Sequence, residues 1–221
     1  TTQKFLNEGW HVGLLARRAD KLSEIADGNQ NAEIYAVDVT NRFAVDKAVS
    51  EFAKSCERLD AIFNNAGVFP SGAVVDEITD EDWLTTVNVN LTGMFYTARA
   101  AFAQMRKQTP QGGRIINNGS ISAHTPREGS LAYTATKHAI TGMTKSIGLD
   151  GRPLNIVCSQ IDIGNARTEI VEAIAAAATP PPMMDVRHAA DAVFHMANLP
   201  LDVNVQTMTI MANQMPYLGR G

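Results

Sequence analysis

A tyrosine and a lysine four positions apart, preceded by a serine, are the residues of this chain best suited to acid–base chemistry. Tyr133 and Lys137 lie in a helix-compatible run, so both side chains are expected on one helical face. A fixed ammonium beside a phenol favours the phenolate and lowers its pKa toward the range that a general acid acting on a carbonyl or alcohol oxygen needs. Ser120 follows an apolar run and is expected at the carboxyl end of a strand, where open α/β sheets bind ligands.

Each of these residues also has an ordinary structural explanation. A tyrosine four positions before a lysine on an amphipathic helix is commonly a packed ring beside a solvated amine, and Ser120 without Tyr133 would be an ordinary loop serine. His138, next to Lys137, is expected to be a helix-surface or interface residue. His124 either lines a substrate pocket or is structural, and the sequence leaves both interpretations open. The rest of the sequence must therefore show whether these residues form an active site or are structural.

The composition narrows the function classes. The chain has 221 residues with 19 basic and 23 acidic side chains and a net charge of −4, which gives no basic patch for nucleic acid and no polybasic membrane anchor. No apolar run approaches the roughly 18 residues of a membrane-spanning helix, and we expect a cytoplasmic protein. Cys56 and Cys158 lie far apart, which argues against a metal site and a disulfide framework. We expect one domain over residues 1–221.

Short apolar strands alternate with helical segments along the chain. The expected strands are Trp10–Leu15, Ala32–Val37, Leu59–Phe63, Arg114–Asn118, Leu154–Cys158 and Val205–Met211. The expected helices are Thr1–Glu8, Asp20–Ala26, Asn41–Cys56, Asp80–Lys107, Ala132–Gly148, Ala166–Ala178 and Asp185–Ala197. A loop is expected around Asp162–Gly164. This order predicts an α/β fold with a parallel sheet and helices on both faces, in three layers.

Two segments depart from regular patterns. The run Asn88–Gly93 is rich in poor helix formers although it lies inside the long expected helix, which indicates a local kink or a side chain with a task other than packing. Ala175–Pro182 has low complexity and is typical of a hinge or the base of a lid.

Several motifs occur together in a fixed order: Asp38-Val39, Asn64-Asn65-Ala66-Gly67, Asn90-Leu91, Gly119-Ser120 and Tyr133-Thr134-Ala135-Thr136-Lys137. In these motifs and their spacing, the sequence resembles the short-chain dehydrogenase/reductase family, in its main single-domain branch, across nearly its whole length. The resemblance implies a Rossmann-type doubly wound parallel sheet.

The resemblance also implies a catalytic set. Tyr133 would be the general acid/base, Ser120 would polarise the substrate oxygen, and Lys137 would lower the tyrosine pKa and hold the nicotinamide ribose. Asn90 would hold a water that links Lys137 to solvent. The family spacing between serine and tyrosine selects Ser120 rather than Ser122.

Further residues would bind the adenosine half of a dinucleotide, if the resemblance is carried over position by position. Asp38 would bond the adenine amino group while Val39 packs on the ring; the alternative is that Asp38 is a turn residue before Thr40. The adenosine ribose would be supported by Asn64, Ala66 and Gly67, which also form a structural turn.

The cofactor is expected to be NADP(H) rather than NAD(H). NAD enzymes place an acid at the end of the second strand, whereas an arginine there suits a 2′-phosphate. Here the position reads Ala16-Arg17-Arg18, so Arg17 is the expected phosphate contact and Arg18 the residue expected to stack on adenine. The alternative is that both arginines are solvated residues at a helix start.

Two departures from the family pattern matter. The first strand and its glycine-rich phosphate loop are missing from this sequence, although that strand would lie between the strands of Val12 and Ile62. We hypothesise that the natural protein is longer, with a similar omission near Thr179, and an intact mass matching this sequence would refute this. After Cys158 the family's Pro-Gly is replaced, and Ile163 is the residue left to offer its backbone amide to the nicotinamide carboxamide.

These observations predict an oxidoreductase that transfers a hydride between NADP(H) and a small-molecule carbonyl or alcohol. The alternative from a different class is a non-catalytic dinucleotide-binding or scaffold relative. In the family, the helices matching Asp80–Lys107 and Ala132–Gly148 pair across a two-fold axis, which implies a homodimer or homotetramer. No nucleic acid, membrane or metal partner is expected.

Overall fold

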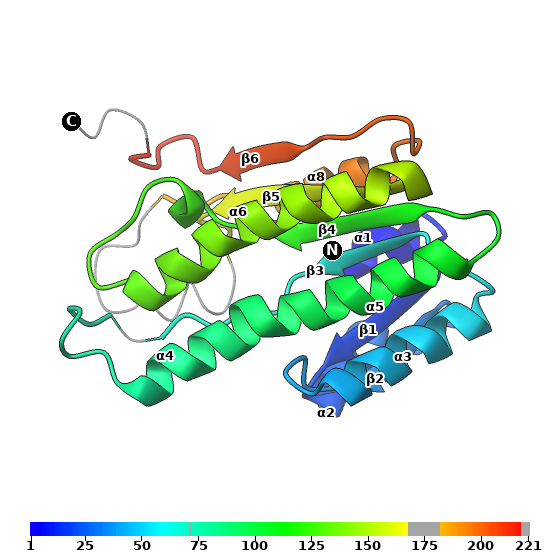
Figure 1. The fold of residues 1–221 in the computed structure, drawn as a ribbon, viewed down its shortest axis with the longest axis horizontal. Helices are drawn as coiled ribbons and strands as arrows, with labels where there is room; N and C mark the ends of the chain where they lie inside the picture. The colour runs from blue at the N-terminus through cyan, green and yellow to red at the C-terminus, as the bar shows by residue number, and fades with distance from the viewer. Residues whose placement is uncertain (71, 168–181, 218–221) are drawn as a thin grey trace.

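Parallel strands and helices alternate through the chain, as the sequence predicts (Figure 1). The computed structural model describes residues 1–70, 72–167 and 182–217. The strands are β1 (Val12–Ala16), β2 (Ala32–Ala36), β3 (Ala61–Asn64), β4 (Gly113–Asn118), β5 (Ile156–Gly164) and β6 (Thr207–Met211). The α-helices are α1 (Thr2–Asn7), α2 (Ala19–Ala26), α3 (Arg42–Ser55), α4 (Asp80–Val87), α5 (Met94–Lys107), α6 (Leu131–Gly151) and α8 (Val186–Ala197). Three short helical segments are η1 (Asn88–Gly93), η2 (Ile121–Ala123) and η3 (Arg152–Leu154).

The strands form two separate parallel sheets. β1 pairs with β2, and a four-stranded sheet has the order β3-β4-β5-β6. The facing edges of β1 and β3 have no strand partner among the described residues. This break lies between the strands of Val12 and Ile62, where the sequence comparison with the family placed the missing strand. A cavity of about 580 Å³ lies here, and Val12, Leu14, Ile62 and Phe63 are among its lining residues.

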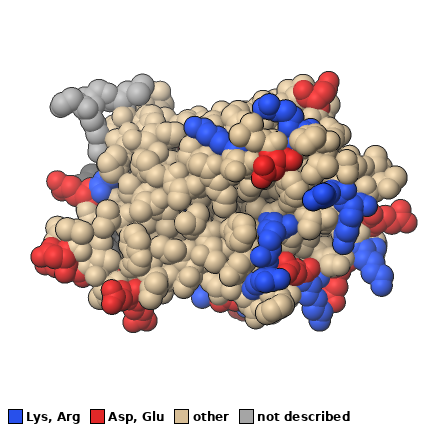
Figure 2. Space-filling view, viewed as in Figure 1, with Lys and Arg blue, Asp and Glu red and all other residues tan. Residues whose placement is uncertain are grey.

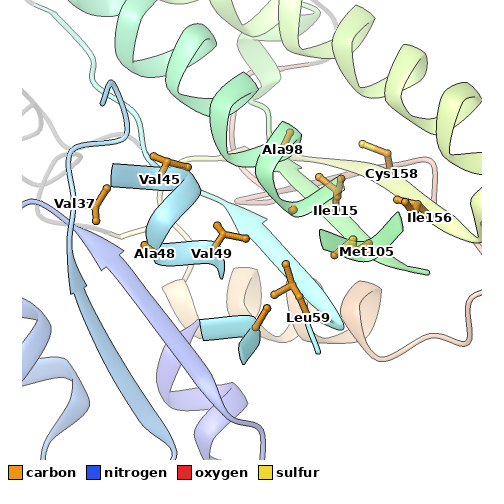
Figure 3. Packing of buried hydrophobic residues seen from close by; sticks show 12 residues of the cluster. Val37, Val45, Ala48, Val49, Leu59, Ala98, Met105, Ile115, Ile156 and Cys158 are labelled. Atoms are coloured by element: carbon orange, nitrogen blue, oxygen red, sulfur yellow. The ribbon is translucent and has the colours of Figure 1, made fainter. Parts of the chain in front are cut away.

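Helices cover both faces of the strands and bury two main apolar clusters. On one face α3 and α5 pack on β3, β4 and β5, and Val45, Met105 and Ile115 are fully buried there (Figure 3). On the other face α1 and α8 enclose Ile116, Ile161 and Val193. The alternation of Ile115 and Ile116 between the two clusters follows from the two-residue period of a strand. The doubly wound, three-layer α/β architecture is therefore confirmed.

The irregularity expected in the long helix is present. Asn88–Gly93 forms a π-helical turn, η1, between α4 and α5. Thr79 caps α4 by accepting a hydrogen bond from the amide of Asp82 at 3.0 Å. The inserted turn brings the side chain of Asn90 to a fully buried position.

One boundary was predicted wrongly. The loop expected around Asp162–Gly164 is the second half of β5, because this part of the strand pairs with β6: Asp162 lies opposite Thr209 and Gly164 opposite Met211. Polar residues suggested a loop, but a strand between two neighbours holds them when their side chains find partners. The expected helix Ala166–Ala178 and the possible omission near Thr179 lie almost wholly outside the described residues.

A buried asparagine ties the carboxyl ends of β3 and β4 to α6. The side-chain oxygen of Asn117 accepts a hydrogen bond from Asn64 Nδ2 at 2.8 Å, and its Nδ2 donates to Thr144 Oγ1 at 2.9 Å. Asn117 is fully buried, so these partners replace the water it loses on folding. The contact fixes α6 relative to the strand that leads into Ser120.

Candidate active site

Ser120 lies immediately after β4, at the carboxyl edge of the sheet, as expected. It is buried and caps the short turn η2, where its Oγ accepts a hydrogen bond from the amide of Ser122 at 3.1 Å. Its own amide donates to Asp162 Oδ1 at 2.9 Å. Both bonds fix the direction of the Ser120 side chain before any substrate arrives. Ser122 is buried in the same turn.

Tyr133 lies in the first turns of α6 and reaches the Ser120 hydroxyl. Its ring packs edge-on against Phe69, with the ring centroids 4.9 Å apart, and the guanidinium carbon of Arg127 lies 5.3 Å from the centroid of the Phe69 ring. Burial is the main cause of a raised pKa for the Tyr133 phenol, and the charge of Asp162 raises this pKa further. A hydrogen bond with Ser120 and the charge of Arg127 act in the opposite direction. Burial is the largest of these effects, so the pKa of Tyr133 is raised overall. The lowering of this pKa by Lys137 that the sequence predicted stays a prediction.

Lys137 is buried one helical turn after Tyr133. Its Nζ donates to the carbonyl oxygen of Asn118 at 2.7 Å and lies 5.4 Å from the centroid of the Tyr133 ring. Burial lowers the pKa of the ammonium to about 8, and the charge of Asp162 acts in the opposite direction. Lys137 is thus a cation held where its charge is costly, a pattern that clusters at functional sites.

Asn90 is close to the same region but its side chain is occupied. Its Oδ1 accepts from the amide of Val68 at 2.7 Å, and its Nδ2 donates to the Val68 carbonyl at 2.9 Å. The π-helical turn therefore holds the segment that follows β3. The water-holding role of Asn90 stays a prediction, and both polar ends of its side chain are used by the protein.

The residues expected to hold the adenosine half line one cavity. These are Arg17, Arg18, Asp38, Val39, Asn64, Ala66 and Gly67, around the space of about 580 Å³ between β1 and β3. The cavity is polar at the strands' carboxyl ends and apolar along their length.

Asp38 makes the contacts of a turn residue, and its expected bond to adenine stays a prediction. Its Oδ1 accepts hydrogen bonds from the amide and hydroxyl of Thr40 at 2.9 and 2.8 Å, as a turn residue does. These bonds, together with the charge of Arg17, lower the pKa of Asp38. Arg17 therefore acts on the same edge of the cavity as Asp38.

The remaining candidate residues lie on β5, on α6 and next to Asp162. Ile163 was expected in a loop, but it lies within β5 and pairs with Ile210. Its expected contact with the nicotinamide carboxamide stays a prediction. His138 is an exposed residue on α6 whose Nδ1 lies 2.9 Å from the carbonyl oxygen of Thr134, as a helix-surface residue would. His124 contacts Asp162, with Nε2 and Oδ2 2.8 Å apart.

Three residues of this site were not identified from the sequence: Asp162, Arg127 and Phe69. For Asp162 a signal existed, because polar and apolar side chains alternate over Gln160-Ile161-Asp162-Ile163, and a strand there would turn Asp162 to the face opposite the two isoleucines. Arg127 and Phe69 lie in connecting segments, and no local pattern places them beside Tyr133.

A family model described as short chain dehydrogenase matches residues 1–179. This chain belongs to the short-chain dehydrogenase family. Its members are oxidoreductases, and the Rossmann-type fold described above is that of its structural neighbours.

Individual relatives agree with this assignment. A 3beta-hydroxysteroid dehydrogenase of Mediterraneibacter gnavus is 29% identical over 71% of this chain and 55% of its own length. The chain thus matches little more than half of that relative. An uncharacterized oxidoreductase of Staphylococcus aureus is 31% identical over 92% of this chain and 87% of its own length. The solved structure of the closed form of serine dehydrogenase complexed with NADP⁺ superposes with a TM-score of 0.89 at 25% identity, covering 100% of this chain and 92% of that one.

The described residues form neither a metal-binding cluster nor a membrane-spanning helix. Across residues 1–70, 72–167 and 182–217, no group of His, Cys, Asp or Glu is arranged to hold a metal ion. In the same ranges no helix is long and apolar enough to cross a membrane.

The buried ammonium predicts an unusual stability effect. Replacing Lys137 with Met should raise the free energy of unfolding at pH 7 by about 1–3 kcal/mol, because the folded state no longer buries a charge whose pKa is depressed to about 8. In the wild type the buried charge destabilises the folded state fully below pH 8. This destabilisation disappears as the pH rises from about 8 toward the pKa of an exposed lysine, so the difference in unfolding free energy between the two proteins should shrink over that pH range.

Denaturant unfolding at several pH values measures this difference. Lys145→Met, an exposed position on the same helix, is the matched control and should change stability by no more than about 0.5 kcal/mol. A Lys137→Met protein less stable than the wild type at pH 7 would contradict the account.

Proposed function

We propose that the protein reduces a small-molecule carbonyl to an alcohol, using NADP(H) and the Ser120, Tyr133 and Lys137 site. The observation that carries the proposal is the convergence of a hydroxyl, a phenol and an ammonium at the carboxyl edge of the sheet, with Ser120 and Tyr133 in contact. Both the steroid dehydrogenase and the serine dehydrogenase compared above are dehydrogenases, which supports chemistry on a CH–OH group.

Each residue has a physical task in this reaction. The Tyr133 phenol donates a proton to the substrate oxygen as negative charge develops there, and Ser120 donates a second hydrogen bond to the same oxygen. Lys137 remains charged below pH about 8, where it stabilises the phenolate left behind. Its raised pKa keeps Tyr133 protonated at neutral pH, which proton donation to a carbonyl oxygen requires. Asn90 would hold the water that links Lys137 to solvent as a proton relay, and its side chain also holds the segment at Val68 in place.

The cavity residues fit the adenosine end of NADP(H), which would supply the hydride. Arg17 and Arg18 are exposed, and neither has a carboxylate within ion-pair distance in the described part of the chain. Free guanidinium groups suit a 2′-phosphate. Asp38 would take the adenine amino group, with Val39 against the ring and Asn64, Ala66 and Gly67 at the ribose. The serine dehydrogenase neighbour is complexed with NADP⁺, which supports the choice.

The alternative is a dinucleotide-binding relative without catalysis. It is favoured less because a scaffold gains nothing from burying Lys137 at the cost that its depressed pKa implies. We place the protein in the cytoplasm, which the unpaired Cys56 and Cys158 support.

Tyr133→Phe tests the function. In the full-length protein, kcat for carbonyl reduction should fall by about 10²- to 10⁴-fold, because the proton donor is gone while the ring still packs on Phe69. NADPH binding should be unchanged. The measurement is NADPH absorbance with a panel of aldehydes and ketones, and Tyr35→Phe on the remote strand β2 is the matched control. Undiminished turnover would remove Tyr133 from the mechanism, and no turnover of any carbonyl by the wild type would favour the scaffold alternative.

Arg17→Asp tests the cofactor. The ratio of kcat/KM with NADPH to that with NADH should fall by about 10- to 100-fold, because a charge-assisted bond to the 2′-phosphate is replaced by repulsion. Arg106→Asp, an exposed arginine at the end of α5, should leave the ratio unchanged. A variant that keeps the wild-type ratio would show that Arg17 is a solvated residue at the start of a helix.

We also propose a homodimer or homotetramer formed by α4, α5 and α6. Exposed apolar side chains lie on these helices at Trp83, Leu84, Phe95, Leu131 and Leu149. Figure 2 shows that the central part of this side of the molecule carries few charged groups, whereas Asp and Glu lie at the left edge and most Lys and Arg lie toward the right. Charge-poor apolar surface is typical of the core of a subunit interface.

Sedimentation of the full-length protein measures this assembly. Phe95→Glu should shift the population toward monomer, whereas Phe43→Glu, at an exposed phenylalanine on α3, should not. A wild-type protein that sediments as a monomer at micromolar concentration would contradict the proposed interface.

A further inference from the structure

A buried carboxylate beside the active site has no role in the reaction proposed above. Asp162 lies on β5, where its side chain faces α6, and it is completely buried. Its Oδ1 accepts from the amide of Ser120 at 2.9 Å and from Gln160 Nε2 at 2.7 Å, and its Oδ2 lies 2.8 Å from His124 Nε2. A carboxylate placed so deeply must be compensated by such partners.

We propose that Asp162 is the positioning residue of this active site and that His124, which it orients, contacts the substrate. The inference rests on the proposed function. Asp162 holds Ser120 through its backbone and His124 through its ring, so both groups are attached to one carboxylate and lie beside the same point of the site.

The approach of the carboxylate explains a glycine in the Gly119-Ser120 motif. A Cβ atom at position 119 would collide with Asp162 Oδ1 and would come within 2.8 Å of Gln160 Nε2. Gly119 itself donates its amide to the carbonyl of Ile161 at 2.8 Å, which draws the end of β4 against β5. The chain around Ser120 is therefore built to admit the Asp162 side chain.

His124 offers one ring nitrogen to the substrate. Its Nε2 is engaged by Asp162, its Nδ1 has no hydrogen-bond partner among the described residues, and 37% of its side chain is exposed. In the neutral ring this leaves Nε2–H as the donor to Asp162 and Nδ1 as an acceptor. Because one carboxylate holds both the His124 ring and the amide of Ser120, the matching substrate class is a carbonyl compound with a hydroxyl or amino group on the carbon next to the reacting carbon.

Asp162 also acts on the charges of the catalytic pair. The ionisable groups that face this part of the site are Tyr133 and Lys137 from α6 and His124 and Arg127 from the segment after Ser120. Asp162 raises the pKa of Tyr133 and of Lys137. Its charge therefore favours a protonated phenol and a charged ammonium together, the combination needed for proton donation.

Asp162→Asn tests the positioning role without requiring turnover. The pKa of Tyr133 is measured from phenolate absorbance, with the Tyr133→Phe background subtracted in both proteins. It should fall in Asp162→Asn, because the negative charge that raises it is removed, and it should not change in Asp185→Asn, an exposed cap residue of α8. An unchanged Tyr133 pKa in a folded Asp162→Asn protein would overturn the proposal.

The wild type provides a second test that stands if Asp162→Asn fails to fold. Histidine ¹⁵N spectra, with His124→Gln to assign the signal, should show a slowly exchanging proton on His124 Nε2. Hydroxyacetone should shift the His124 Nδ1 signal, whereas 2-butanone, in which a methyl replaces the hydroxyl, should not. A proton on Nδ1 alone, or equal responses to both ketones, would overturn the proposal. Neither the pKa measurement nor the histidine spectra require carbonyl reduction. They therefore distinguish failure of the proposal for Asp162 and His124 from failure of the proposed function.

Discussion

Burial of the Lys137 ammonium at the carboxyl edge of the sheet is the constraint on which the rest of the active site depends. Its charge is accommodated by the Asn118 carbonyl and by the nearby carboxylate of Asp162, and its pKa still falls to about 8. The hydrogen bond from Lys137 on α6 to Asn118 at the end of β4 forms only if α6 keeps a fixed position relative to β4 and β5. Asn117, which bonds to both Asn64 and Thr144, provides that fixation.

The same packing sets the protonation of the reacting group. Burial raises the pKa of Tyr133 more than Ser120 and Arg127 lower it, so the phenol holds its proton at neutral pH. The interaction of a lysine with a tyrosine on one helix face is therefore only part of the chemistry. Two residues from outside that helix, Asp162 and Arg127, modify the charge balance around it: Asp162 raises the pKa of Tyr133 and Arg127 lowers it.

Much of the fold could be predicted from the sequence, because the spacing of apolar residues is a local signal. It indicates a strand or a helix without knowledge of the tertiary contacts. The π-helical turn was foreseen as an irregularity at Asn88–Gly93 for the same local reason. The second half of β5 was not, because Gln160 and Asp162 are polar and become strand residues only through partners on β6, η2 and α6. Likewise the direction of the Tyr133 pKa depends on burial, which no spacing of residues reveals.

The carboxyl ends of β1, β2 and β3, beside the break between β1 and β3, carry the residues expected to bind the cofactor. The residues expected around adenosine, from Arg17 to Gly67, line one space at this break, although they come from segments far apart in sequence. Their convergence follows from the parallel arrangement of the strands, whose carboxyl ends meet at one edge.

The central claim, that this edge of the sheet carries out hydride transfer, is tested most directly by following the hydrogen itself. Full-length protein is supplied with NADPH deuterated at the transferring position and with an α-hydroxyketone, and the product alcohol is analysed by mass spectrometry. The account predicts one deuterium on the new carbinol carbon. Cofactor bound by the folded protein with no deuterium transferred to any carbonyl compound would contradict it.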